Sequence, residues 1–176
     1  VPMRTGTPWT DEHLRLYAEL LGVSSEHILL LDHPFEHRNR QEYFNHCQSC
    51  KDFDLFLDPD TGVESDSCCD KRHVSFCDLN CLLPDKSRRL VMVYQHRSRM
   101  RDSVQGVLAR IRQRGWPACT YWAGAVAMLF LSRDIDRIKC LQNALAEWLG
   151  PCTEEQHGCP RRVFSNAVDG DAGVAG

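Results

Sequence analysis

The stretch PACTYWAGAVAMLFLS, residues 117–132, sets the expected fold of the second half of the chain. It holds two apolar runs separated by little more than Gly124, the pattern of two antiparallel strands joined by a tight turn. Residues 89–95, RLVMVYQ, predict an earlier strand, and residues 161–168, RRVFSNAV, predict a later one. We therefore expect a β-sheet that is built around this hairpin.

Two amphipathic helices are expected to connect these strands. Residues 100–115 and 134–150 each place apolar side chains at helical spacing and end at a glycine, and we expect Trp148 to face inward. The order β-α-β-β-α-β is that of the split βαβ unit, so residues 85–168 predict a ferredoxin-like sandwich. Residues 169–176 have little apolar content and are expected to form a mobile tail.

Residues 1–84 have a mainly helical pattern. Thr10 is a good N-cap for a helix that ends at Gly22, and shorter helices are expected over residues 26–31 and 36–46. A small strand or hairpin arm follows in the segment KDFDLFLDPDTG. The chain is thus expected to be an α+β protein, in which an N-terminal helical zinc-binding module precedes the ferredoxin-like domain.

Charge is distributed unevenly along the chain, although its net value is only -3. Residues 1–85 carry 7 Lys and Arg against 16 Asp and Glu, whereas residues 86–114 carry 9 against Asp102 only. This division suggests different partners for the two parts, or an attraction between them. No apolar run has the length of a membrane span and no signal peptide is evident, so we expect an intracellular protein of the cytoplasm or nucleus.

Six of the ten cysteines fall close together and indicate a metal site. Cys47 and Cys50 have the C-x2-C spacing that lets two thiolates reach one tetrahedral ion. Four further candidate ligands follow at intervals of four residues, which would place them on one face of a helix: Cys69, His73, Cys77 and Cys81. We therefore expect structural Zn²⁺, with one ion as the simplest case and two as an upper number.

The choice of four ligands stays open at this level. Cys69 with His73 would complete the site begun by the C-x2-C pair, and His73 with Cys77, or Cys77 with Cys81, could take their place. Disulfides are an alternative that would need an oxidising compartment, for which nothing else in the sequence argues. Buried core thiols are a further alternative, but these cysteines are mixed with Asp, Lys and Arg.

A basic patch is expected where two distant segments meet. The first and third strands of the predicted sheet are antiparallel neighbours, so residues 86–89 should lie beside Ser132 and Arg133. Over residues 86–150 the arrangement and the lengths of the elements are similar to those of the origin-binding domains of polyomavirus large T antigens. That resemblance implies contacts to DNA from two loops at these places.

Nucleic acid is the first candidate partner, because the planar fork of arginine suits phosphate. In addition, three aromatic residues follow the basic segment: Trp116, Tyr121 and Trp122. The residues expected to bind nucleic acid or another partner are Lys86, Arg88, Arg89, Arg97, Arg99, Arg101 and Arg133. The expected role is regulatory recognition. The alternatives are a protein-protein adaptor or host-interaction factor that uses the acidic zinc module, and a homo-oligomer is compatible with each.

We do not expect an enzyme. The chain lacks the motifs of nucleotide binding and of a serine nucleophile. A papain-like cysteine protease with Cys119 and His157 is a distant alternative, but Cys119 falls in a predicted strand and is expected to be a structural residue.

Overall fold

A computed structural model of the chain describes residues 10–22, 24–29, 31, 37–50, 52–59, 61–64, 72–96, 104–123, 126–149 and 161–165. Over these residues the protein combines helices and strands in an α+β fold, as the sequence predicts.

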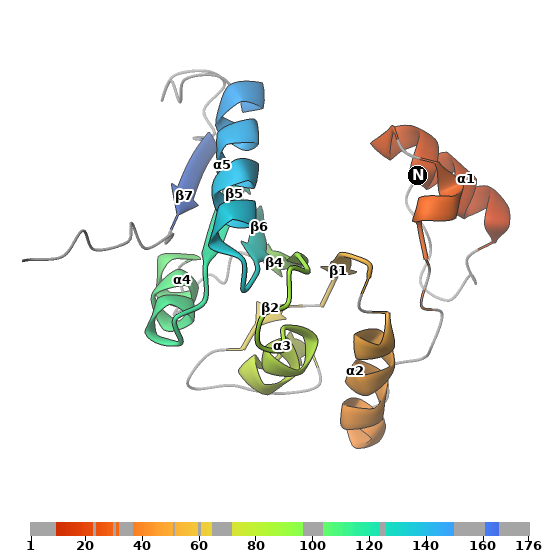
Figure 1. Ribbon diagram of the computed structural model, residues 1–176, viewed down its shortest axis with the longest axis horizontal. Coiled ribbons are helices and arrows are strands. Elements are labelled where there is room, and N and C mark those ends of the chain that lie inside the picture. The colour runs from red at the N-terminus through yellow and green to blue at the C-terminus, as the bar shows by residue number, and fades with distance from the viewer. Residues whose placement is uncertain are drawn as a thin grey trace, which may run out of the picture.

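One five-stranded sheet organises the structure (Figure 1). Its strands, in their order across the sheet, are β1 (Leu55–Leu57), β4 (Val91–His96), β6 (Val126–Leu131), β5 (Ala118–Ala123) and β7 (Arg161–Ser165). β1 runs parallel to β4, and all the other neighbours are antiparallel. The predicted hairpin is confirmed as β5 and β6, and β6 is the central strand.

Each face of the sheet has its own apolar layer, because successive side chains of a strand point to opposite faces. Helix α4 (Val104–Gln113) packs on one face, in a core that includes Val91. Helix α5 (Ile135–Leu149) packs on the other face, where Ile138 joins Phe130. Figure 1 shows the two helices on either side of the strands.

This arrangement differs from the ferredoxin-like sandwich that the element order predicts. In that sandwich the last strand pairs with the first and both helices share one face, whereas β7 here pairs with β5. β1 occupies the outer edge of β4, which leaves the edge of β5 for β7. The connections β4–α4–β5 and β6–α5–β7 cross the sheet in the same direction, but β4 and β6 run antiparallel to each other. Right-handed connections therefore place α4 and α5 on opposite faces.

The elements between α1 and β4 pack on the same face as α4. Those that contribute to its core are α2 (Arg40–Ser49), α3 (Phe76–Leu82) and a small parallel sheet of β2 (Gly62–Val63) and β3 (His73–Val74). A single core joins Phe44 of α2 to Leu129 of β6. β1 and α2 thus share a sheet and a core with later elements, and the domain boundary at residue 84 stays a prediction.

The first helix, α1 (Asp11–Leu21), has both of its predicted ends. The hydroxyl of Thr10 accepts a hydrogen bond from the backbone amide of His13, and Gly22 ends the helix in the left-handed conformation with φ of 67°. In Figure 1 this helix lies apart from the sheet, on the far side of β1.

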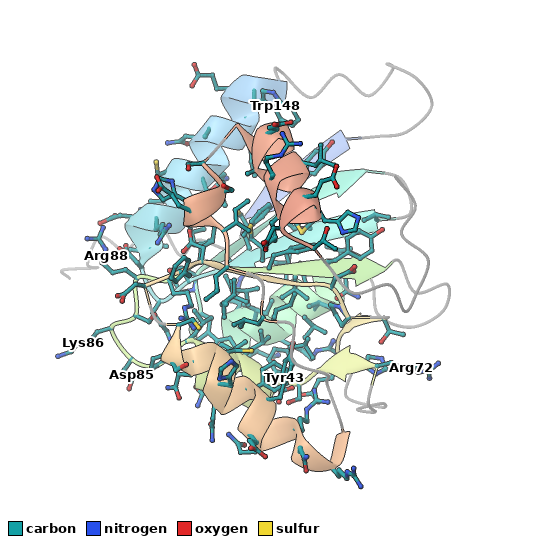
Figure 2. All side chains as sticks on the ribbon, turned by 90° about the vertical axis from the view of Figure 1, so that its right-hand side faces the viewer. Tyr43, Arg72, Asp85, Lys86, Arg88 and Trp148 are labelled. Carbon is teal, nitrogen blue, oxygen red and sulfur yellow. The ribbon has the colours of Figure 1, made fainter. Side chains whose placement is uncertain are left out.

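Two other helical predictions need correction. The helix expected over residues 26–31 is only a 3-10 turn, η1 (Ser25–His27), because the backbone at Ile28 is already extended. A second turn, η2 (His37–Asn39), leads into α2. Trp148 does not face inward but is 78% exposed at the end of α5 (Figure 2).

None of the described helices combines the length and apolar character needed to cross a membrane.

Candidate functional site

The C-terminal end of α2 carries the C-x2-C pair. Cys47 lies in the last turn and is buried, and Cys50 follows as the half-buried C-cap residue. The backbone amide of Cys50 donates to the carbonyl of Cys47 at 3.3 Å, so one turn joins the two residues. Burial raises the pKa of the Cys47 thiol, and the neighbouring Cys50 raises it further.

Arg89 meets this pair from the loop before β4. Its side chain is buried, and its guanidinium donates to the backbone carbonyl of Cys47 at 3.3 Å and to that of Cys50. These carbonyls are at the end of the helix, where the negative pole of the helix dipole favours a cation. Arg89 was predicted to bind a partner at the surface, but its position makes it part of the thiol region instead.

Helix α3 brings a third thiol toward the pair. The Sγ of Cys81 lies 3.5 Å from Oδ1 of Asn45 and 3.9 Å from Oε1 of Gln48, both on α2. Burial raises the pKa of Cys81, and Asp78 adds to the effect. Cys81 is also one of the groups that raise the pKa of Cys47. Three of the predicted ligands are thus in the same region of the molecule.

The four-residue series of predicted ligands does not lie on one helix. Helix α3 begins only at Phe76, because Ser75 caps it. The Ser75 hydroxyl accepts from the amide of Asp78 at 3.1 Å, and the Asp78 carboxylate accepts from the amide of Ser75 at 2.7 Å. His73 precedes this cap and lies in β3, so only Cys77 and Cys81 share a helix face.

The remaining predicted ligands are placed differently. The carbonyl of His73 accepts from Arg40 at the first residue of α2, and Cys47 lies seven residues further along, about 10 Å of helix. Cys77 is exposed. Within the described ranges, no three His, Cys, Asp or Glu side chains converge closely enough to hold an ion. Cys69 lies outside those ranges, so the ligand sets that include it stay predictions.

A second region of interest is the edge where two distant segments meet, as predicted. Val91 pairs with Leu131, which brings the loop before β4 beside the first turn of α5. The guanidinium of Arg88 donates to the carboxylate of Asp134 at 2.9 Å. Figure 2 shows Lys86 and Arg88 projecting outward from this loop. We call Lys86, Arg88 and Arg137 the basic edge.

Arg137 ties the basic edge together. Its guanidinium donates to the carbonyl of Arg88 at 2.7 Å and to the carboxylate of Asp54 at 2.6 Å. An open cleft of about 500 Å³ lies here, lined by residues 52–54, residues 84–89 and Arg137. Sequence reasoning missed Arg137, although its position one turn after Asp134 directs a long side chain back toward the loop.

Asp134 is the N-cap of α5 and sets the charge balance of this edge. Its carboxylate accepts from the amides of Asp136 at 3.0 Å and Arg137 at 3.3 Å. Burial acts to raise the pKa of Asp134, but the hydrogen bonds from the Arg137 amide and the Arg88 side chain outweigh it, so the pKa is lowered.

Lys86 is the most accessible cation of the basic edge. It is exposed, it has a left-handed backbone with φ of 65°, and it makes no ion pair among the described residues. Arg133 is held more firmly, because it donates to the carbonyl of Leu83 at 2.9 Å and packs over the ring of Trp116 at 5.0 Å. The other predicted contacts, Arg97, Arg99 and Arg101, lie outside the described residues.

The arginines of α4 do not form one solvated basic face. Arg110 is buried and donates to the carbonyl of Glu64 at 2.9 Å. Arg114 lies over the ring of Phe76 at 3.7 Å, and Trp116 is buried beside that ring. Trp116, the predicted aromatic residue that follows these arginines in the sequence, therefore packs in the core, where it cannot stack on a base.

Cys119 is a strand residue, as the sequence predicts. It lies in β5 with no solvent exposure, and burial raises its pKa to about 12. A protonated and inaccessible thiol is a poor nucleophile. His157 lies outside the described residues, so the pairing of the protease alternative is not assembled in the described part of the chain. All six described cysteines are free thiols.

Comparison with known proteins gives no further guide to the site. Neither a protein family, nor a curated protein, nor a solved structure matches this chain.

Proposed function

We propose that this protein recognises nucleic acid through the basic edge, in a regulatory role. The observation that carries the proposal is the meeting of two segments from distant parts of the sequence, residues 84–90 and residues 132–137. Together they present Lys86, Arg88 and Arg137 on one side of the molecule, beside an open cleft.

The chemistry of the basic edge suits phosphate. Arg88 has an accessible guanidinium, with 84% of its side chain exposed, and Lys86 adds a mobile ammonium beside it. Asp134 partly neutralises Arg88 in the unbound protein, and because the Arg88 side chain is exposed it can exchange this partner for another anion. The predicted contacts Arg97, Arg99 and Arg101 belong to the same proposal.

Binding of short single-stranded and duplex oligonucleotides at several salt concentrations tests the proposal. We expect the affinity to fall steeply with salt, and the double variant Lys86→Ala/Arg88→Ala to bind about tenfold more weakly with a smaller salt slope. Arg112→Ala is the matched control, because Arg112 is an exposed cation on α4, across the sheet from α5. Salt-independent binding, or an equal loss in the control, would contradict the proposal.

We also propose that structural zinc stabilises the region around α2 and α3. Cys47 and Cys50 would supply two ligands, and the other two would come from Cys69 and the residues His73, Cys77 and Cys81. The proximity of Cys81 to the C-x2-C pair supports this second proposal.

Elemental analysis of protein purified without added metal tests zinc binding, and single Cys→Ser variants assign the ligands. We expect one zinc per chain, and a strong chelator should reduce the helical circular dichroism signal. Loss of zinc in Cys47→Ser and Cys50→Ser, with retention in the matched control Cys140→Ser, is the expected pattern. A spectrum that the chelator leaves unchanged would count against a structural metal.

A further inference from the structure

Arg89 is a buried cation whose close partners carry no formal negative charge. Its side chain is 4% exposed, and its two hydrogen-bond acceptors are the backbone carbonyls of Cys47 and Cys50. Its Nε atom has no hydrogen-bond partner, and among the described residues it forms no ion pair. This combination is uncommon, because a buried charge is normally matched by an opposite one.

Two exposed carboxylates, Asp52 and Asp54, line the same cleft as Arg89, but neither forms an ion pair with it among the described residues. Asp54 accepts from the amide of Leu90 at 2.9 Å and from Arg137 at 2.6 Å, so it is already engaged elsewhere. The residues that the Arg89 guanidinium contacts directly are Cys47 and Cys50, through their backbone carbonyls. The side chains best placed to compensate Arg89 are therefore the two cysteines.

Neutral thiols bring no charge, but zinc-bound thiolates do. Zn²⁺ held by four thiolates has a net charge of about -2, and three thiolates with one imidazole leave about -1. We propose that Arg89 is the counter-charge of a zinc–thiolate centre at Cys47 and Cys50, and that its charge favours the metal-loaded state over the empty one. This inference rests on the proposed zinc binding and goes beyond it, because it assigns a function to a residue that is not a ligand.

The competing explanation is that Arg89 only caps helix α2. A cap would stabilise the empty and loaded proteins equally, because the carbonyls of Cys47 and Cys50 are present in both. A counter-charge stabilises mainly the loaded state. The two explanations therefore differ in zinc affinity, measured on protein that stays folded.

The test compares the full chain with Arg89→Gln and Arg89→Lys by competition for zinc with a chromogenic chelator at fixed pH. Gln keeps a hydrogen-bond donor without the charge, and Lys keeps the charge without the fork. We expect Arg89→Gln to weaken zinc binding by about tenfold or more, and Arg89→Lys by only about threefold or less. Cobalt substitution, followed by the thiolate charge-transfer band, checks that both variants keep the same ligands.

Arg112→Gln is the matched control, because it removes the same positive charge from an exposed residue of α4. Its zinc affinity should equal that of the unmodified chain. Equal losses in Arg89→Gln and Arg89→Lys, or no loss in Arg89→Gln, would overturn the inference and leave zinc binding intact. If the unmodified chain binds no zinc, the proposed zinc centre and the role of Arg89 both fail. The proposal of nucleic-acid binding would not be affected, because oligonucleotide binding is measured separately.

Discussion

Helix α2 has a buried arginine at each end, and the two are compensated in different ways. At the first residue, Arg40 donates from Nε to both oxygens of the Asp78 carboxylate at 3.0 Å. At the last turn, Arg89 donates to the carbonyls of Cys47 and Cys50. The first arginine is neutralised within the protein, and its role is structural. The second forms no ion pair with any described carboxylate, which is why we connect it with a metal centre.

The largest effect on stability is expected at the Arg40 end of α2. Asp78→Asn removes the buried carboxylate that accepts from Arg40 and caps α3, so we expect the free energy of unfolding to fall by about 3 kcal/mol. Urea denaturation measures this loss. Arg40→Gln/Asp78→Asn should lose less than the single variant, because the charge that Asp78 pairs with is removed as well. An unchanged midpoint in Asp78→Asn would mean that this pair is not a structural anchor.

A smaller loss is expected at the other end. Arg89→Met removes the two hydrogen bonds that a charged group donates to the carbonyls of Cys47 and Cys50, which keep their backbone donors, and we expect the metal-free protein to lose about 2 kcal/mol. Removing an incompletely matched charge offsets part of the penalty, so the loss should stay below that of Asp78→Asn. Urea denaturation in the presence of a chelator makes the comparison. A loss larger than that of Asp78→Asn would show that Arg89 is fully compensated in the absence of metal.

Lys86 offers a further contrast with Arg89. It is a cation of the same loop, but it makes no ion pair among the described residues. Its left-handed backbone is unfavourable for a residue with a side chain, so Lys86→Gly should raise the free energy of unfolding by about 1 kcal/mol. The same variant should bind oligonucleotides more weakly. Thermal or urea denaturation checks the first effect, and a destabilised Lys86→Gly protein would indicate that the lysine side chain has a packing role.

The smallest effect on stability is expected for the ion pair between Arg88 and Asp134, whose arginine is exposed to solvent. The folded-state pKa of Asp134 is lowered, so its contribution is complete above the pKa of an unfolded aspartate, about 3.9, and is lost as pH falls below it. Urea midpoints between pH 3 and pH 6 measure this. The gap between the unmodified chain and Asp134→Asn should close toward acid pH, and a constant gap would contradict the assignment.

Local patterns in the sequence predicted the elements well. Thr10 and Gly22 define the ends of α1 through hydrogen bonds to their own helix, and the runs on either side of Gly124 form the β5–β6 hairpin. The meeting of the loop before β4 with the first turn of α5 also follows, because it depends only on β4 and β6 being antiparallel neighbours. Features that depend on nearby residues could thus be read from the chain.

Features that depend on long-range pairing could not. The parallel pairing of β1 with β4 has no local signal, yet it determines the position of β7 and the face that α5 covers. The burial of Arg89 was missed for a similar reason, since arginine is rarely buried without a carboxylate partner. In contrast, the start of α3 could have been found, because Ser75 with Asp78 three residues later is a capping signal.

The position of β1 also bears on solubility. Without it, β4 would form the margin of the sheet, with unpaired backbone groups along the apolar run Val91–Val93. An open strand of this kind is a template for pairing with other chains and for aggregation. β1 covers it and presents in its place only three residues between Asp54 and Asp58, whose charges discourage further strands. A strand from the N-terminal half of the chain thereby covers an edge of the sheet that the C-terminal half builds.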